Sequence, residues 1–519
     1  MKKMWRYLNS KALYYAVMFS GLFLLFFALG ENGYLMWSDS PAYLACDGRT
    51  GIMPLYPLLI KGNQLLFKES LYLYAIVVAQ AILSIACIVI FTEFVRKQFE
   101  LSYLASYPVW LFSAFMPFTV NLPQSVSSHD IKTEAIAYPL FYLYMICFLK
   151  AIWDKQYKWI IITMLMSSCL ALTRTQLQLC VVLSAAALFY VMWIRIVIQK
   201  KGLKRIGCFV ICVCICGMSA GIGEGIILMS NSVGQRMISV INAWEEQKTV
   251  QSVDLDVKTE LSVEEVKTEE IKAVEEIKND TAKESVNDNV TKQYGHLVID
   301  KAIWEIDEDD YLLFEDIEKQ KFCREIFAVA DEQKSRYAYI RNDLWKWEDI
   351  MNNIAGGTAV LGEAWTRYLS KNPDTYLESS VGNEIAWGLL IEHIGRVFLH
   401  TLQMMPQGFV CTVFFQKAEF YGLCHLIALF VYLSALWMVI WGYRNKELPN
   451  KYPEFMLGCI VVNVLFVLIL CVMFFAMQRY LVYCFGIFYV AYYLIGVKYV
   501  GYLGRKIYGK SRVCDTKLY

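Results

Sequence analysis

Long apolar segments alternate with short polar ones along most of this 519-residue chain. Most of the apolar segments have the ~20 residues that a helix needs to cross the hydrocarbon core of a bilayer. The pattern predicts an all-α polytopic membrane protein with about ten transmembrane helices. They cover residues 12–31, 71–94, 102–121, 135–153, 159–173, 177–197, 206–230, 420–442, 454–474 and 480–502.

The first apolar segment, Ala12 to Leu29, has the form of a secretory signal. It follows four basic residues, but no small-x-small cleavage motif precedes Glu31. We therefore interpret it as an uncleaved first helix.

Composition agrees with the membrane assignment. Hydrophobic residues make up 57% of the chain and aromatic residues 15%, more apolar surface than the core of a soluble domain can bury. The net charge of +1 gives no indication of a nucleic-acid partner. Of the 16 cysteines, most lie within apolar segments and act as small hydrophobic residues. Cys46 and Cys323 fall in outward loops, where they either pair or remain free thiols.

The distribution of Lys and Arg predicts the orientation. With the N-terminus inside, the inner segments carry 22 basic residues and the short outer segments only six. The six are Arg49, Lys61, Lys68, Lys132, Arg174 and Arg479. Both termini are expected to be cytoplasmic, in a multi-pass protein of the cell (plasma) membrane whose active site faces outside.

Four regions follow from this topology. Residues 1–230 form a module of about seven spans with a first outer loop at 32–70, and residues 420–519 form a C-terminal module of about three spans. The extracytoplasmic region 231–393 combines an acidic low-complexity segment at 245–292, expected to be disordered or a single exposed helix, with a small helical domain at 294–380. The interrupted apolar stretch 385–418 predicts interfacial or re-entrant helices, with two further spans as the alternative.

Ionisable residues gather at the outer ends of the predicted spans, where a cavity or partner is expected to stabilise them. The first loop contains Trp37-Ser-Asp-Ser-Pro-Ala-Tyr43 and then Arg49-Thr-Gly-Ile-Met-Pro-Leu-Tyr-Pro57. Later outer segments carry His129, Asp130, Lys132 and Glu134, then Arg174, then Arg479-Tyr480. Carboxylates that accept a proton and guanidinium groups that hold phosphate oxygens suit a reaction on a phosphate-bearing membrane substrate.

Each motif also has a purely structural interpretation. Asp39 lies just before Pro41, a pattern that caps and starts a helix. The outer arginines could extend along the membrane interface, and the residues from His129 to Glu134 could form a solvated turn. The order and sidedness of the motifs together are more specific than any one of them.

In that order, the motifs resemble the GT-C superfamily of membrane glycosyltransferases. The Ser-Asp-Ser-Pro-x-Tyr and Arg-x-x-x-x-Pro-x-Tyr-Pro pair is most similar to the branch with protein O-mannosyltransferases and the aminoarabinose transferase of lipid A. Thr133-Glu134 resembles the acidic second-loop position of that branch, and Leu172-Thr-Arg174 its Thr/Ser-Arg element. The chain departs from the protein O-mannosyltransferases in having one acid, Asp39, where they have two.

The resemblance implies inverting transfer of a hexose or pentose from a polyprenyl-phosphate donor to an acceptor on the extracytoplasmic face. That acceptor would be an envelope polysaccharide, lipid or protein. Asp39 would be the catalytic general base, and Arg174, with Arg49 and Arg479 as weaker candidates, would bind the lipid phosphate. Tyr56 and Glu134 complete the candidate substrate-binding set. No cofactor is required, although Asp39, Asp130 and Glu134 offer ligands for a divalent cation.

Two other functions are alternative interpretations of the same sequence features. A transporter or flippase for lipid-linked saccharides would show charges in the middle of the spans and inverted repeats. In this chain mid-span charges are few, and no repeat relates the two halves. A non-catalytic assembly protein for envelope saccharides would use the large outer region as its binding module.

Overall fold

The computed structural model describes residues 7–28, 33–36, 40–45, 53–67, 71–115, 128–198, 200, 203–257, 300–336, 356–372, 381–413, 421–473 and 478–508. Within these ranges the regular secondary structure is helical, apart from one isolated bridge between Leu35 and Asp130. The bundle contains α2 (Lys11–Phe23), η1 (Leu24–Ala28), α5 (Tyr72–Gln98), α6 (Tyr103–Phe115), α7 (Glu134–Asp154), α8 (Tyr157–Ala171), η3 (Thr175–Gln178), α9 (Leu179–Met192), η4 (Trp193–Val197), α10 (Leu203–Val257), α18 (Tyr421–Arg444), α19 (Lys451–Met473) and α20 (Gln478–Tyr508).

Each of the ten predicted spans coincides with one of these helical segments. Seven are long and apolar enough to cross a membrane: those over Tyr72–Gln98, Glu134–Asp154, Thr175–Val197, Lys204–Gly223, Gly422–Arg444, Lys451–Val472 and Tyr480–Ile507. Lys11–Phe27 and Tyr157–Ala171 are shorter apolar helices, and α6 is described only as far as Phe115. The chain is therefore, by helix length and composition, an all-α multi-pass membrane protein.

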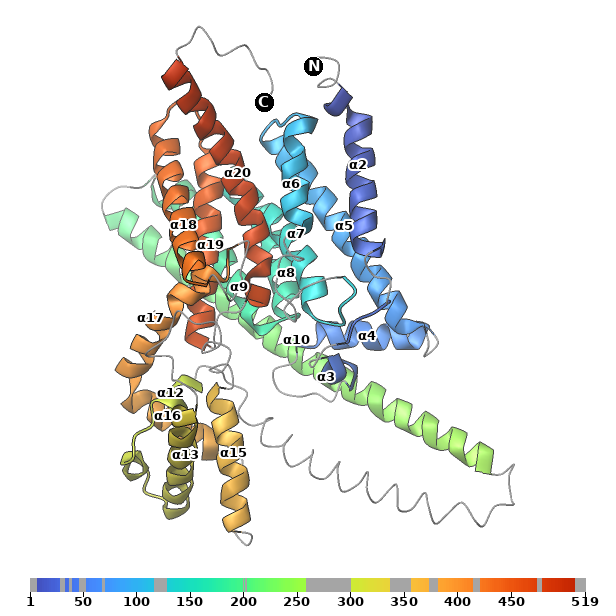
Figure 1. The fold of residues 1–519 in the computed structure, drawn as a ribbon, viewed down its shortest axis with the longest axis vertical. Coiled ribbons are helices and arrows are strands. Elements are labelled where there is room, and N and C mark those ends of the chain that lie inside the picture. Colours follow the sequence, from blue (N-terminus) through green and yellow to red (C-terminus); the bar gives the residue numbers. More distant parts are fainter. Residues whose placement is uncertain are drawn as a thin grey trace.

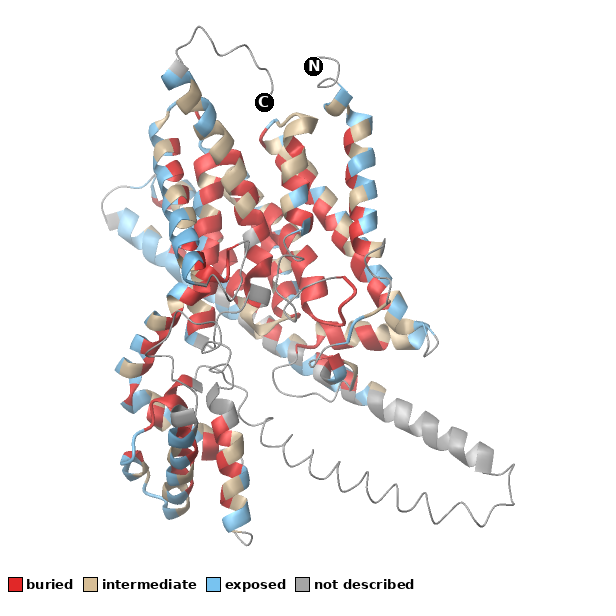
Figure 2. Cartoon of the chain, viewed as in Figure 1, coloured by how far each residue is buried: buried red, intermediate tan, exposed pale blue. Residues whose placement is uncertain are grey.

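The bundle packs around α7 and α20. Phe141, Tyr142 and Tyr144 of α7 are fully buried, as are Tyr483 and Ile495 of α20 (Figure 2). The outer helices instead expose large apolar side chains, such as Leu426, Phe430 and Leu433 of α18. An apolar outer surface around the packed bundle is what contact with lipid tails requires.

The two ends of the bundle differ (Figure 1). The start of α2, the α5–α6 and α18–α19 connections and the C-terminal part of α20 lie at one end, which we call the terminal end. There the Asn9 side chain accepts a hydrogen bond from the Leu104 backbone at 3.0 Å. Two short helices, α3 (Ser40–Ala45) and α4 (Leu55–Leu66), lie with residues 128–134 at the opposite end, the loop end.

Helix α10 is much longer than its predicted span and runs obliquely across the others (Figure 1). It continues through residues 245–257, the first part of the acidic segment, and the rest of that segment lies outside the described residues. Gly234 is required where α10 crosses α4, because a Cβ there would lie 2.5 Å from the side chain of Pro54.

A second hydrophobic core lies beyond the loop end (Figure 1). It is formed by α12 (Asp300–Trp304), η5 (Asp310–Leu313), α13 (Ile317–Arg336), α15 (Gly356–Lys371), α16 (Val381–Glu392) and the start of α17 (Ile394–Val410). Ile385, Ala386 and Leu389 are buried in this core, so α16 packs with the small helical domain. Helix α17 continues from there to α18 and α19, and it is not among the helices of transmembrane length and apolarity.

Polar contacts fix the second core to the bundle. The Lys301 ammonium donates to the carbonyl of Val472, at the end of α19, at 3.3 Å. At the start of α17, His393 hydrogen-bonds Asp310 at 2.6 Å, and two turns further along His400 contacts Glu305 at 3.2 Å. Asp307, Asp310 and His393 place their ligand-type atoms close together, and Asp307 is also ion-paired with Arg396.

Cys323 lies in the second core with 1% of its surface exposed and is a free thiol. Burial, aided by the charge of Asp310, raises the pKa of this thiol to about 12. Of the two alternatives for the outer cysteines, the structure favours a free Cys323, while Cys46 lies outside the described residues.

Candidate functional site

The candidate site is built on the segment Ser128–Glu134 at the loop end. The first outer loop pairs with this segment through its backbone: Leu35 donates to the carbonyl of His129 at 2.8 Å and accepts from Ile131 at 3.0 Å. Gly33 makes this approach possible, since its φ is +78° and a Cβ would lie 2.7 Å from the ring of Tyr74.

Ser40 gives the first loop a second anchor. Its hydroxyl is fully buried and donates to the carbonyl of Ile131 at 2.8 Å. Because Ser40 follows Asp39 directly, this contact brings the chain next to the candidate base up to the segment that carries Asp130 and Glu134. Asp39 itself lies outside the described residues.

Gln80 of α5 holds the same segment from the membrane side. Its side-chain amide donates to the carbonyls of Ser128 at 2.7 Å and Asp130 at 3.2 Å. Its amide oxygen accepts from the Tyr56 hydroxyl at 2.9 Å. All these groups are buried, so Gln80 connects α4, α5 and the second outer loop through hydrogen bonds that water does not replace.

We expect Gln80→Leu to lower the free energy of unfolding by about 2–4 kcal/mol, because it leaves buried carbonyls and a tyrosine hydroxyl without their partner. Tyr56→Phe, which removes only one of the three bonds, should cost about 1 kcal/mol. Thermal unfolding of the purified variants in detergent measures both. Equal losses would show that the bonds to Ser128 and Asp130 contribute nothing.

The charged residues of the site are buried. Asp130, Lys132 and Glu134 each have 1% of their surface exposed. Lys132 lies 4.0 Å from Asp130, and Glu134 forms an ion pair with Arg174. Since a lone charge in such a place is strongly unfavourable, Asp130 is matched by Lys132 of the same segment and Glu134 by Arg174 of the α8–α9 hairpin tip.

Arg174 is the centre of this network. Besides its ion pair with Glu134, its Nη1 donates to the Thr133 hydroxyl at 3.1 Å, and Thr133 donates in turn to Glu134 at 3.1 Å. The Arg174 guanidinium lies 5.0 Å from the centre of the Tyr480 ring at the start of α20. The second outer loop, the α8–α9 hairpin tip and α20 thus meet at one arginine.

The local environment shifts three pKa values. Burial acts to lower the pKa of Arg174, but the charge of Glu134 and neighbouring tyrosines raises it well above the usual arginine value. Burial lowers the pKa of His129, partly opposed by Asp130, so this imidazole is neutral at pH 7. Burial, reinforced by Tyr43, Glu134 and Asp130, raises the pKa of Tyr56 well above 10, so its hydroxyl remains a hydrogen-bond donor.

An apolar groove of about 420 Å³ adjoins the site between α4 and α10. The backbone of Leu55 donates to the carbonyl of Leu172 at 3.1 Å, and both residues line the groove. Leu172 is two residues from Arg174, and Leu55 is next to Tyr56. The remaining lining residues are Pro54, Leu58, Met229, Ser230, Val233, Gly234 and Met237.

The structure brings together Arg174, Glu134, Tyr56 and Asp130 from the predicted set. Arg49 and Asp39 lie outside the described residues, and Arg479 lies at the start of α20 with its side chain undescribed. The ion pair of Arg174 with Glu134 was not anticipated, because the family resemblance implied a separate ligand for each residue. Gln80 was missed, although a glutamine within an apolar span was a signal that could have found it.

Two of the residues considered as ligands for a divalent cation have cationic side chains beside them. Asp130 lies 4.0 Å from Lys132, and Glu134 is ion-paired with Arg174. Within the described ranges, the group of three metal-type ligands lies in the second core, at Asp307, Asp310 and His393.

Comparison with family models, with curated proteins and with solved structures finds no match to this chain.

Proposed function

We propose that this protein is a membrane glycosyltransferase of the GT-C type, which transfers a sugar from a polyprenyl-phosphate donor to an acceptor on the extracytoplasmic face. One observation carries the proposal: a buried Glu134–Arg174 pair includes a residue of the segment that anchors the loop of Asp39, and Leu172, two residues before Arg174, lines an apolar groove. The site therefore combines three features that a reaction on a lipid-phosphate sugar needs: an acid, a phosphate-binding cation and an apolar groove.

Each residue has a role in the proposed reaction. Asp39 takes the proton from the acceptor hydroxyl as its oxygen attacks the anomeric carbon. The bond from that carbon to the donor phosphate breaks, and the polyprenyl phosphate leaves with the electron pair. Direct displacement of this kind inverts the anomeric configuration.

Arg174 binds the phosphate in this mechanism. Its guanidinium has five N–H donors, and Nη1 serves Thr133 and Glu134. Glu134 and the Tyr480 ring orient the group so that a phosphate approaching from the groove meets a charge already in place. Although burial acts to lower the pKa of Arg174, the charge of Glu134 and of neighbouring tyrosines raises it, so its guanidinium is charged at neutral pH.

The groove supports the lipid part of the substrate. All its lining residues except Ser230 are apolar, and its walls come from α4, α10 and the end of α8. A prenyl chain gains about 0.8 kcal/mol for each CH₂ that it buries, so a groove of this kind favours lipid-linked over soluble sugar donors.

The direct test is transfer by the purified protein in lipid nanodiscs. We expect polyprenyl-phosphate hexoses or pentoses to yield free polyprenyl phosphate and a glycosylated product when an envelope acceptor fraction is added, while nucleotide sugars yield none. The same donors in proteoliposomes provide the control. Movement of intact donor between leaflets without cleavage would assign the protein to transport and contradict the transferase proposal.

A further inference from the structure

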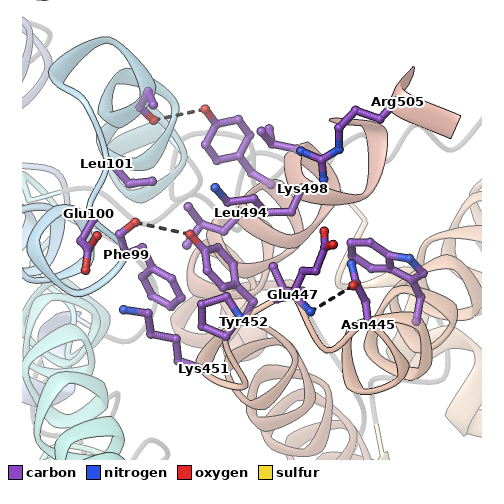
Figure 3. Close-up of a pocket in the computed structure, with 16 residues that line it drawn as sticks. Phe99, Glu100, Leu101, Asn445, Glu447, Lys451, Tyr452, Leu494, Lys498 and Arg505 are labelled. Atoms are coloured by element: carbon purple, nitrogen blue, oxygen red, sulfur yellow. Dashed lines mark hydrogen bonds between the residues drawn. The ribbon is translucent and has the colours of Figure 1, made fainter. Parts of the chain in front are cut away.

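A second cavity, of about 380 Å³, is lined by residues at the terminal end of the bundle (Figure 3). Three segments that are far apart in the sequence enclose it: the α5–α6 connection, the α18–α19 connection and the C-terminal half of α20. Its lining includes Glu100, Glu447, Lys451, Tyr452, Lys498 and Arg505.

Cations from two helices converge on this cavity. Lys498 and Arg505 are seven residues apart on α20, which is two helical turns, so both side chains lie on one face about 10 Å apart along the axis. Lys451 comes from the first turn of α19 and donates to the carbonyl of Gln98. Two carboxylates, Glu100 and Glu447, also line the cavity, so its three cations exceed its acids by one charge.

Aromatic rings hold the walls in place. The Lys498 ammonium lies 5.5 Å from the centre of the Tyr452 ring, and that of Lys451 lies 5.6 Å from Phe99. The Tyr452 hydroxyl donates to the carbonyl of Phe99 at 3.3 Å, and that of Tyr493 to Ala105 at 3.1 Å (Figure 3). These bonds connect α19 and α20 to the α5–α6 connection, so the cavity is formed before a ligand arrives.

The position of Lys498 in its transmembrane span indicates which kind of ligand the cavity binds. Lys498 falls within the apolar span Tyr480–Ile507, and an ionisable residue there is unfavourable unless it faces a cavity or a partner. Because the cavity lies at one end of the transmembrane bundle, we infer that it lies at the level of lipid headgroups. Basic pockets between transmembrane helices at this level bind the phosphates of anionic lipids.

We propose that the cavity between α5, α19 and α20 binds the phosphate of an anionic phospholipid headgroup, with Lys498 and Arg505 as its principal ligands. The Tyr452 ring beside the Lys498 ammonium holds that cation in place for the phosphate. The proposal is independent of the transferase activity, since none of the lining residues belongs to the loop-end site.

The test uses delipidated full-length protein in detergent, titrated with phosphatidylglycerol or with phosphatidylcholine, while thermal stability and retained lipid by native mass spectrometry are followed. We expect phosphatidylglycerol to raise the melting temperature and to remain bound, and phosphatidylcholine to do neither. Lys498→Gln with Arg505→Gln should weaken phosphatidylglycerol binding by about tenfold or more.

Two variants make the result specific. Arg444→Gln with Lys446→Gln removes the same charge from exposed residues at the same end that do not line the cavity, and it should bind like the wild type. Lys498→Arg with Arg505→Lys preserves the charge and should retain binding. Equal weakening in the Arg444 and Lys446 variant would overturn the proposal, as would an equal response to inorganic phosphate or to phosphatidylcholine.

Discussion

Replacing Asp39 with asparagine should abolish sugar transfer while the protein remains folded and inserted. A general base contributes about 10²–10⁴-fold to such a reaction, so kcat should fall by that factor with little change in KM. The isosteric amide keeps a helix-capping hydrogen bond, so a residue that only caps α3 would tolerate the change. The measurement is donor-dependent transfer in nanodiscs, with thermal stability measured on the same preparation.

The matched control is Asp47→Asn, which removes another carboxylate from the same outer loop. We expect this variant to transfer sugar at the wild-type rate. If Asp39→Asn transferred equally well, Asp39 would have no catalytic role and its part in the loop would be structural.

The second large effect concerns Arg174, whose side chain is 14% exposed and whose partner Glu134 is 2% exposed. Replacing Arg174 with glutamine leaves the Glu134 carboxylate buried without its cation, so the free energy of unfolding should fall by about 3–5 kcal/mol. Arg195→Gln, at the far end of the α9 segment, is the control and should change stability by about 0.5 kcal/mol or less.

The double variant Glu134→Gln with Arg174→Gln separates stability from function. Two amides of similar size can hydrogen-bond to each other, so we expect most of the lost stability to return. Transfer should remain absent, because no cation is left to bind the donor phosphate. Recovery of transfer together with stability would restrict Arg174 to a structural role.

The transmembrane helices were predictable because hydropathy is a local property. Each predicted span is helical over the residues that the structure describes, since a chain in lipid must satisfy its backbone hydrogen bonds within the segment. The helix α4 was not predicted. Its sequence from Leu55 to Leu66 is apolar but interrupted by Pro57 and Lys61, and its placement across the loop end depends on contact with α10 through Pro54 and Gly234.

The candidate site was predictable only as a set of residue types on one side of the membrane. The partners of Arg174 lie about 40 residues away at Thr133 and Glu134 and about 300 away at Tyr480, and no local pattern links them. The same holds for Gln80, which reaches Ser128 and Asp130 across about 50 residues.

The sequence by itself determined that this chain is a multi-pass helical protein and that its acids and arginines gather in the segments between spans. Both properties follow from the preference of each short segment for lipid or water. Only the tertiary structure decided that Glu134 and Arg174 form a buried pair, that an apolar groove adjoins them, and that Lys498 and Arg505 face a cavity at the other end. Such contacts depend on how whole helices pack, because their energy comes from groups that meet only after the chain has folded.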